Sequence, residues 1–97
     1  MRWVEIINAR FASLADTSEA GNLIADIRSS LKADECKSLK MVVLRGLFVD
    51  SDMAIHLHWE TRLPPSGRTG IGIKLAEIIK PMALLDHSIW IEDHGEK

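Results

Sequence analysis

The stretch Met41–Arg62, MVVLRGLFVDSDMAIHLHWETR, decides the fold of this chain. Its first part, Met41–Val49, is almost continuously apolar and short for a helix, which favours a strand buried on both faces. Asp50–Asp52 follows as a polar turn. Met53–Arg62 then alternates between two faces, one formed by Ile55, Leu57 and Trp59 and the other by His56, His58 and Glu60. Two such strands joined by three polar residues predict a β-hairpin.

A strand and a helix are predicted before this hairpin. Trp3–Phe11 is rich in β-branched and aromatic residues, which suit a strand. Asp16 stands three residues before Glu19, a spacing typical of a helix start. The residues that follow at helical spacing predict one buried stripe, formed by Ala20, Leu23, Ile24, Ile27 and Leu31. The polar stretch Ala33–Lys40 is then a connection.

A second helix and a last strand are predicted after the hairpin. A helix is expected over Thr69–Leu85, with a buried stripe of Ile71, Leu75, Ile78 and Met82. Pro81 predicts a kink, or an end near Lys80, because proline lacks an amide proton. The glycine-rich stretch Gly67–Gly72 is interpreted as the entry turn of this helix, in preference to an anion site. His87–Glu92 is expected to be the last strand.

The resulting order of elements is strand–helix–strand–strand–helix–strand. This order is that of a ferredoxin-like α+β fold, in which two helices cover one face of a four-stranded antiparallel sheet. With 97 residues, the chain is expected to form a single domain, residues 1–97.

The second face of the predicted sheet is too apolar for a solvent-exposed surface. Trp90 falls on the opposite side of the last strand from Ile89 and Ile91, so both sides of that strand are apolar. An apolar second face on a small protein usually marks an interface. We therefore expect a homodimer that packs through the sheet faces.

Composition excludes several classes of function. The net charge of −2 offers no basic surplus, so nucleic acid is not an expected partner. No apolar run is long enough to span a membrane, and Glu5 interrupts the segment where a signal peptide would be apolar. The single cysteine, Cys36, cannot form an internal disulfide. These features predict a cytoplasmic protein with no membrane association.

Two segments resemble a known family. Ala54–Glu60, AIHLHWE, is similar to the third strand of antibiotic-biosynthesis-monooxygenase-like proteins in the dimeric α/β barrel superfamily, and Leu75–Glu92 resembles small bacterial proteins of unknown role. The resemblance implies a dimeric ferredoxin-like fold. The superfamily includes cofactor-free monooxygenases and haem-degrading enzymes, and Asn8 matches the strand-one asparagine of the latter. The helix over Thr69–Leu85 has no histidine for haem iron, so no cofactor is expected. The segment after Trp59 is also too short for the helical stretch that closes the pocket in many members.

Several polar and aromatic residues are candidate site residues. His58 and Asn8 are candidate catalytic residues, because a histidine can act as a base near neutral pH and an amide can orient a carbonyl. His56, Trp59 and Arg45 are candidate ligand-binding residues. A metal site is a further hypothesis, with His56, His58 and Glu60 as ligands, or with His87 as the third.

Structural interpretations of the same residues are favoured. The histidines fit a polar sheet face, and Arg45 fits an ion pair with Glu5 or Glu60 across strands. The three tryptophans, Trp3, Trp59 and Trp90, fit the core of a dimer.

The sequence therefore predicts a small cytosolic dimer that binds a small organic molecule and is related to cofactor-free monooxygenases. One alternative is a non-catalytic module for self-association or partner docking. Another is a metal-binding protein that uses His56 and His58. Whether the protein is an enzyme stays open at this stage.

Overall fold

The computed structural model describes residues 1–31 and 37–92. Its elements, in chain order, are β1 (Arg2–Phe11), α1 (Leu14–Ser29), β2 (Leu39–Arg45), β3 (Asp52–Glu60), α3 (Gly70–Ile79), the short 3-10 turn η1 (Lys80–Met82) and β4 (Ala83–Ile91). Cys36 and the first half of the predicted connection over Ala33–Lys40, residues 33–36, lie outside the described residues. Within residues 1–31 and 37–92, no helix is both long and apolar enough to cross a membrane.

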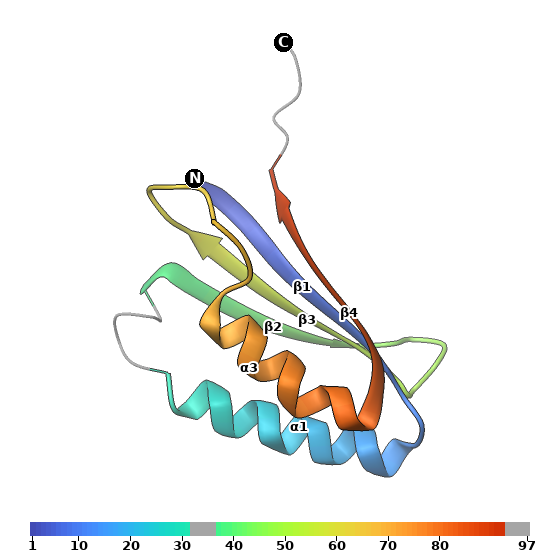
Figure 1. The fold of residues 1–97 in the computed structure, drawn as a ribbon. Coiled ribbons are helices and arrows are strands. Elements are labelled where there is room, and N and C mark those ends of the chain that lie inside the picture. Colours follow the sequence, from blue (N-terminus) through green and yellow to red (C-terminus); the bar gives the residue numbers. More distant parts are fainter. Residues whose placement is uncertain (32–36, 93–97) are drawn as a thin grey trace.

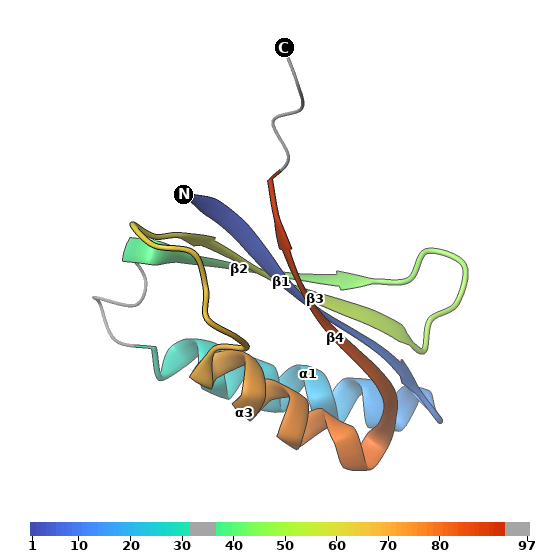
Figure 2. The same cartoon turned by 45° about the horizontal axis from the view of Figure 1, so that its top comes forward.

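The four strands form one antiparallel sheet in the order β2-β3-β1-β4. Figures 1 and 2 show α1 and α3 side by side on the same face of this sheet. The predicted α+β, ferredoxin-like fold is therefore confirmed.

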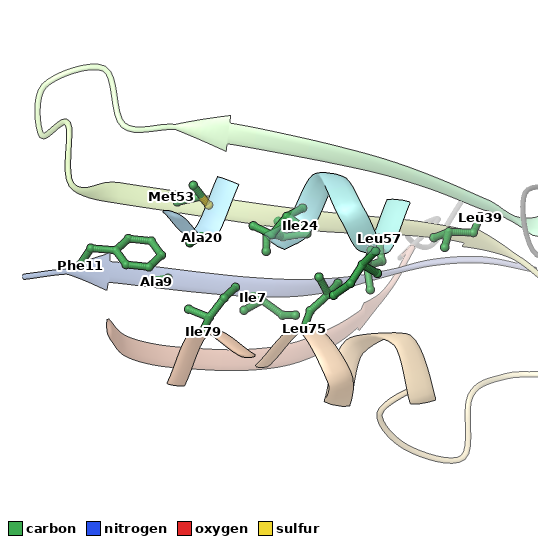
Figure 3. Close-up of a cluster of buried hydrophobic side chains, with 12 residues drawn as sticks. Ile7, Ala9, Phe11, Ala20, Ile24, Leu39, Met53, Leu57, Leu75 and Ile79 are labelled. Carbon is green, nitrogen blue, oxygen red and sulfur yellow. The ribbon is translucent and has the colours of Figure 1, made fainter. Parts of the chain in front are cut away.

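The alternation of side chains along β1 divides the sheet into two faces. Odd-numbered residues from Trp3 to Phe11 face the helices and are buried, whereas even-numbered residues from Val4 to Arg10 face away. The core between sheet and helices consists of Ile7, Ala9, Phe11, Ala20, Ile24, Ile27, Leu39, Met53, Ile55, Leu57, Leu75 and Ile79 (Figure 3). We call the opposite side of the sheet the open face.

The first helix begins earlier than predicted. Ser13 is its N-cap, and the Ser13 hydroxyl accepts a hydrogen bond from the Asp16 amide at 3.1 Å. A serine in this position satisfies an amide that the first turn leaves unpaired. Asp16 is thus an acidic residue in the first turn and not the start of the helix.

The apolar run Met41–Val49 is not one strand. β2 ends at Arg45, and Leu47 and Phe48 lie in the following loop with 84% and 93% of their surfaces exposed. Gly46 explains the early end, because a Cβ atom at this position would overlap the Val49 carbonyl oxygen. The prediction that this strand is buried on both faces is therefore wrong. The strand was predicted to continue past Gly46 because the residues that follow this glycine are also apolar.

Of the two outcomes predicted at Pro81, an end of the helix near Lys80 is confirmed, but the last strand begins earlier than predicted. α3 ends at Ile79, and Pro81 lies at the start of η1. The first amides of a helical turn have no hydrogen-bond partner within the turn, so the missing amide proton of proline costs nothing there. β4 then begins at Ala83, four residues before the predicted start at His87. Ala83, Leu84 and Leu85 are strand residues and do not belong to the last turn of the helix.

Gly72 lets α3 approach β1 closely. Gly72 is buried on the face of α3 that meets the sheet, and a Cβ atom built on it would overlap the side-chain carboxylate of Glu5. The Glu5 carboxylate is itself fully buried. The contact therefore requires glycine, although this glycine lies inside a helix.

Replacing Gly72 by alanine should lower the stability of the fold. The added methyl group has to displace the buried Glu5 carboxylate or push α3 away from the sheet, which should reduce the free energy of unfolding by about 1–3 kcal/mol. Urea unfolding followed by circular dichroism measures the change.

Gly21→Ala is the matched control for this experiment. A Cβ atom at Gly21, in α1, would meet nothing within 4 Å, so the substitution should raise stability by up to about 1 kcal/mol through helix propensity. Equal effects of the two substitutions would contradict the close approach of α3 to β1.

Candidate functional site

A buried acidic residue lies between the sheet and the first turn of α3. Glu5 is fully buried on the helix-facing side of β1. Its Oε1 accepts a hydrogen bond from the Thr69 hydroxyl at 2.6 Å, and its Oε2 accepts one from the Thr69 amide at 3.2 Å. Thr69 is the N-cap of α3, and its hydroxyl also accepts a hydrogen bond from the Gly72 amide at 3.0 Å. The positive end of the helix therefore binds the protein's own carboxylate.

His87 completes this group from the neighbouring strand. The register of β1 with β4 places His87 opposite Ile7, on the same face as Glu5, and its Nε2 lies 2.6 Å from Glu5 Oε2. Only 4% of the His87 side chain is exposed. A buried carboxylate is costly unless hydrogen bonds and opposite charge compensate for the lost water. Here Thr69, the helix terminus and His87 supply that compensation. We call Glu5, Thr69 and His87 the buried acid–histidine cluster.

This cluster corrects two predictions. Arg45 was expected to pair with Glu5 or Glu60 across strands, but Glu5 bonds to Thr69 and His87, and Glu60 pairs with Arg2. His87 was considered as a third metal ligand beside His56 and His58, but it lies on the helix-facing side of the sheet, whereas those two histidines lie on the open face.

The open face carries the histidine pair. Four aligned rows cross β3, β1 and β4 on this face: His58, Val4 and Trp90; His56, Ile6 and Ser88; Ala54, Asn8 and Asp86; and Asp52, Arg10 and Leu84. The ring centroids of His56 and His58 lie 5.8 Å apart. Partial burial, and then the neighbouring His58, hold the pKa of His56 below its ordinary value. Partial burial and the neighbouring ring therefore disfavour the charged form of His56.

The structure adds no third metal ligand to this pair. Glu60 is on the same face but pairs with Arg2 at 3.8 Å, near the end of the sheet. In the described part of the chain, no three histidine, cysteine or acidic side chains gather closely enough to hold a metal ion.

A hollow of about 520 Å³ lies at one end of the open face. Asn8 and Asp86, which are aligned across β1 and β4, bring an amide and a carboxylate to it, and Leu44, Ala54 and Leu84 contribute apolar side chains. We call this depression the open-face hollow. Its volume is in the range of sites for small organic molecules, and an apolar wall with a few polar groups is typical of such sites.

The open-face hollow is bordered by an ion pair. Arg10 donates two hydrogen bonds to the Asp52 carboxylate, at 2.8 and 3.2 Å. These bonds hold the pKa of Asp52 below its usual value. Arg45 also lines the hollow, although no salt bridge involves its side chain among the described residues.

The two candidate catalytic residues are not brought together. Asn8 lines the open-face hollow, whereas His58 lies two rows away and lines a separate depression with Val4 and Trp90. The row that contains His56 and Ile6 separates them. A single small molecule in the hollow would therefore contact Asn8 without reaching His58.

The three tryptophans do not share one environment. Trp3 and Trp59 stack on the helix-facing side with their ring centroids 5.5 Å apart. Trp90 lies on the open face and is 59% exposed. The interpretation of all three as dimer core is wrong for Trp3 and Trp59, because they pack within one chain.

Trp59 carries a buried donor without an acceptor. The indole Nε1 of Trp3 donates to the Thr61 hydroxyl at 2.8 Å, but the indole Nε1 of Trp59 is buried and has no hydrogen-bond partner among the described residues. Such an orphan donor costs about 1–3 kcal/mol. Trp59 also lines a depression with Lys40 and His58, so its place is consistent with the predicted ligand contact.

Sequence reasoning missed the buried acid–histidine cluster, although a signal for it was present. Glu5 occupies a core position in the alternation that Trp3, Ile7, Ala9 and Phe11 share. An acidic residue in such a position requires a partner. The partner was not identified because His87 stands 82 residues away and because the register of β1 with β4 cannot be read from the sequence.

Comparisons with known proteins bear on the fold. No family model and no curated protein matches the sequence. Among solved structures, SnoaB, a cofactor-independent oxygenase from Streptomyces nogalater, is similar, with TM-scores of 0.63 for a mutant form and 0.61 for a second structure. Both are 10% identical and match 97% of this chain and 95% of that chain.

A dimeric ferredoxin-like protein from an uncultured marine organism is also similar. Its TM-score is 0.55 at 10% identity, over 99% of this chain and 93% of that chain. At this identity the likeness concerns the fold alone, and it agrees with the element order and sheet topology described above. The chain therefore has a ferredoxin-like fold.

Proposed function

We propose that two copies of this chain pack through their open faces and bind a small organic molecule in the hollow that the partner copy covers. The open-face hollow carries the proposal. It combines an apolar wall with the Asn8 amide and the Asp86 carboxylate, and it lies on a sheet face that no helix covers. A second sheet above it would turn a depression into an enclosed site, which excludes water from the polar groups.

The exposed apolar side chains of the open face support the dimer. Leu84 is 79% exposed, Trp90 is 59% exposed and Leu44 is 45% exposed, and all three point away from the helices. Exposed apolar side chains gathered on one face of a small domain usually mark an interface. The similar fold of a protein described as dimeric and ferredoxin-like supports the same arrangement.

The proposal extends to cofactor-free chemistry on the bound molecule. The similar fold of a cofactor-independent oxygenase supports this extension. Such chemistry requires a substrate that forms a stabilised carbanion, so the protein supplies a base, an orienting group and a dry site. Asn8 is the orienting group that the open-face hollow offers.

A module that only self-associates is the second candidate. The exposed apolar residues that support the dimer favour this candidate equally, because they form an interface whether or not the hollow is occupied. Occupancy of the hollow therefore separates the two candidates.

Leu84→Glu should convert the dimer to a monomer. The substitution places a carboxylate on the proposed interface, where it would be buried without a partner. Sedimentation equilibrium at micromolar concentrations should show a dimer for the unmodified protein and a monomer for this variant.

Leu63→Glu is the matched control for the dimer. Leu63 is 76% exposed in the loop after β3, close to the exposure of Leu84 but outside the open face. This variant should remain dimeric. A monomeric unmodified protein, or a Leu84→Glu variant that stays dimeric, would show that the open face is not the interface.

The native state should lose stability in acid because of His56. The pKa of His56 is lowered in the folded protein, so the unfolded chain binds the proton more readily. The contribution of His56 to the free energy of unfolding is therefore complete above the ordinary histidine pKa of about 6.5, and it is lost as the pH falls below this value. Urea unfolding between neutral and mildly acidic pH should show a smaller loss for His56→Gln than for the unmodified protein.

The same argument predicts the titration of His56 itself. Removing the neighbouring imidazole by His58→Gln should raise the pKa of His56 toward its ordinary value, which NMR titration of the ring protons measures. A pKa of His56 that does not move in this variant would show that the two rings do not interact.

The bound molecule should be detectable in freshly purified protein. Native mass spectrometry should show a dimer whose mass exceeds that of two chains by a small organic molecule in each subunit. Asn8→Leu removes the amide at nearly constant volume and should lower occupancy by up to about 10-fold, the value of one hydrogen bond. A bare dimer in every preparation would favour self-association without ligand binding.

A further inference from the structure

We propose that the buried acid–histidine cluster is a general base, in which Glu5 orients His87 and His87 removes a proton from a small organic molecule bound between α3 and β4. Glu5 and His87 lie on the helix-facing side of the sheet, whereas Asn8 lies on the open face, although Leu84, Leu85 and Asp86 of the edge strand β4 border both spaces. The proposal does not require the open-face hollow to be occupied.

The hydrogen bonds of Glu5 determine which nitrogen of His87 carries the proton. A carboxylate only accepts hydrogen bonds, so the Nε2 atom that lies 2.6 Å from Glu5 Oε2 must donate. In neutral His87 the other nitrogen, Nδ1, then has a free lone pair. No hydrogen-bond donor to Nδ1 exists among the described residues. Nδ1 is thus the atom of the cluster that can accept a proton.

The cluster is rigid enough to hold this arrangement. Both oxygens of Glu5 are engaged, Thr69 is fixed as the N-cap of α3, and Gly72 leaves no space for the carboxylate to move toward the helix. A base whose partners prevent it from turning loses little freedom when a substrate binds. Glu5 and Thr69 are positioning residues in this account, and His87 is the catalytic residue.

A groove gives a small molecule access to His87. The space between α3 and β4 measures about 590 Å³ and is lined by His87, with Ile73, Ala76 and Leu85 among its apolar side chains. We call it the α3–β4 groove. β4 is an edge strand of the sheet, so neither a further strand nor a helix beyond α3 closes the groove within the described chain.

The charges of the α3–β4 groove restrict the class of ligand. Arg68 and Lys80 contribute two positive charges, and Glu77 and Asp86 contribute two negative ones. Arg68 is also tied to the His87 backbone oxygen by a hydrogen bond of 3.0 Å. With no net charge to attract a strongly charged compound, the groove suits a neutral or weakly acidic molecule, such as an enolisable carbonyl compound or a phenol.

The proton transfer needs no further reactant. The C–H or O–H bond of the ligand breaks, its electron pair stays on the ligand as an enolate, carbanion or phenolate, and the proton binds to Nδ1 of His87. The imidazolium formed is stabilised by the Glu5 carboxylate. It returns the proton to water or to the product.

A base-catalysed elimination tests the proposal without knowledge of the natural ligand. In 5-nitrobenzisoxazole, removal of the C3 proton breaks the N–O bond and gives a coloured nitrophenolate. The protein should accelerate this reaction, and His87→Gln should reduce the acceleration by at least about 10-fold, since a positioned base contributes a factor of this size or more. Glu19→Gln, which changes an exposed acid on α1, should react like the unmodified protein.

Equal rates for the unmodified protein and a folded His87→Gln variant would overturn the proposal. Circular dichroism shows whether the variant is folded. If the His87→Gln variant does not fold, a second measurement on the unmodified protein tests the proposal. Nitrogen-15 NMR of the unmodified protein should show that the neutral form of His87 carries its proton on Nε2 and leaves Nδ1 bare. A neutral form with its proton on Nδ1 would equally overturn the proposal.

The positioning role of Glu5 has its own readout. In Glu5→Gln, the amide can present either its oxygen or its nitrogen to Nε2, so His87 should become a mixture of the two tautomers. If Glu5 served packing alone, the tautomer of His87 would not change in this variant.

Discussion

The burial of Glu5 is the constraint on which the rest of the helix-facing side depends. A buried carboxylate on the inner strand β1 requires several hydrogen bonds, and residues from distant segments of the chain provide them. Thr69 and the first turn of α3 approach from one side, and His87 on β4 approaches from the other. These contacts fix where the second helix begins and how it lies on the sheet. They also explain why a glycine, Gly72, stands inside that helix.

The two faces of the sheet therefore have different chemical characters. The helix-facing side combines an apolar core with one buried polar cluster, in which both carboxylate oxygens of Glu5 form hydrogen bonds. The open face combines partly exposed apolar residues with the histidine pair and the open-face hollow, and nothing in the described chain covers it. A small domain gains stability by burying such a face against a second copy.

The element order and the alternation of β3 were predictable because they depend on local patterns. His56, His58 and Trp59 fall on the predicted faces, and Thr69 begins the second helix as its sequence indicates. The ends of elements were harder to predict. Apolar residues continue past the end of β2 and through the turn at Pro81, so hydrophobicity alone could not locate either boundary. The glycine and the proline mark the boundaries through backbone geometry.

The candidate sites were less predictable, because they join residues that are distant in the chain. Asn8 was identified as a polar residue in a strand, but its alignment with Asp86 follows only from the register of β1 and β4. The pairing of Glu5 with His87 depends on the same register. His58 and Asn8 were grouped because both are chemically versatile, yet the strand geometry separates them by two rows. Residue type thus indicated candidates, and only the topology showed which of them share a site.

The most direct test of the account is an isotope-filtered NOE experiment on a mixture of labelled and unlabelled chains. It detects only contacts between two different copies. If the open faces pack together, methyl groups of Val4, Val42 and Leu44, which point away from the helices, will show contacts with the other copy. Contacts restricted to methyl groups of α1 and α3, or no contacts at all, would contradict the division of the sheet into a core face and an interface.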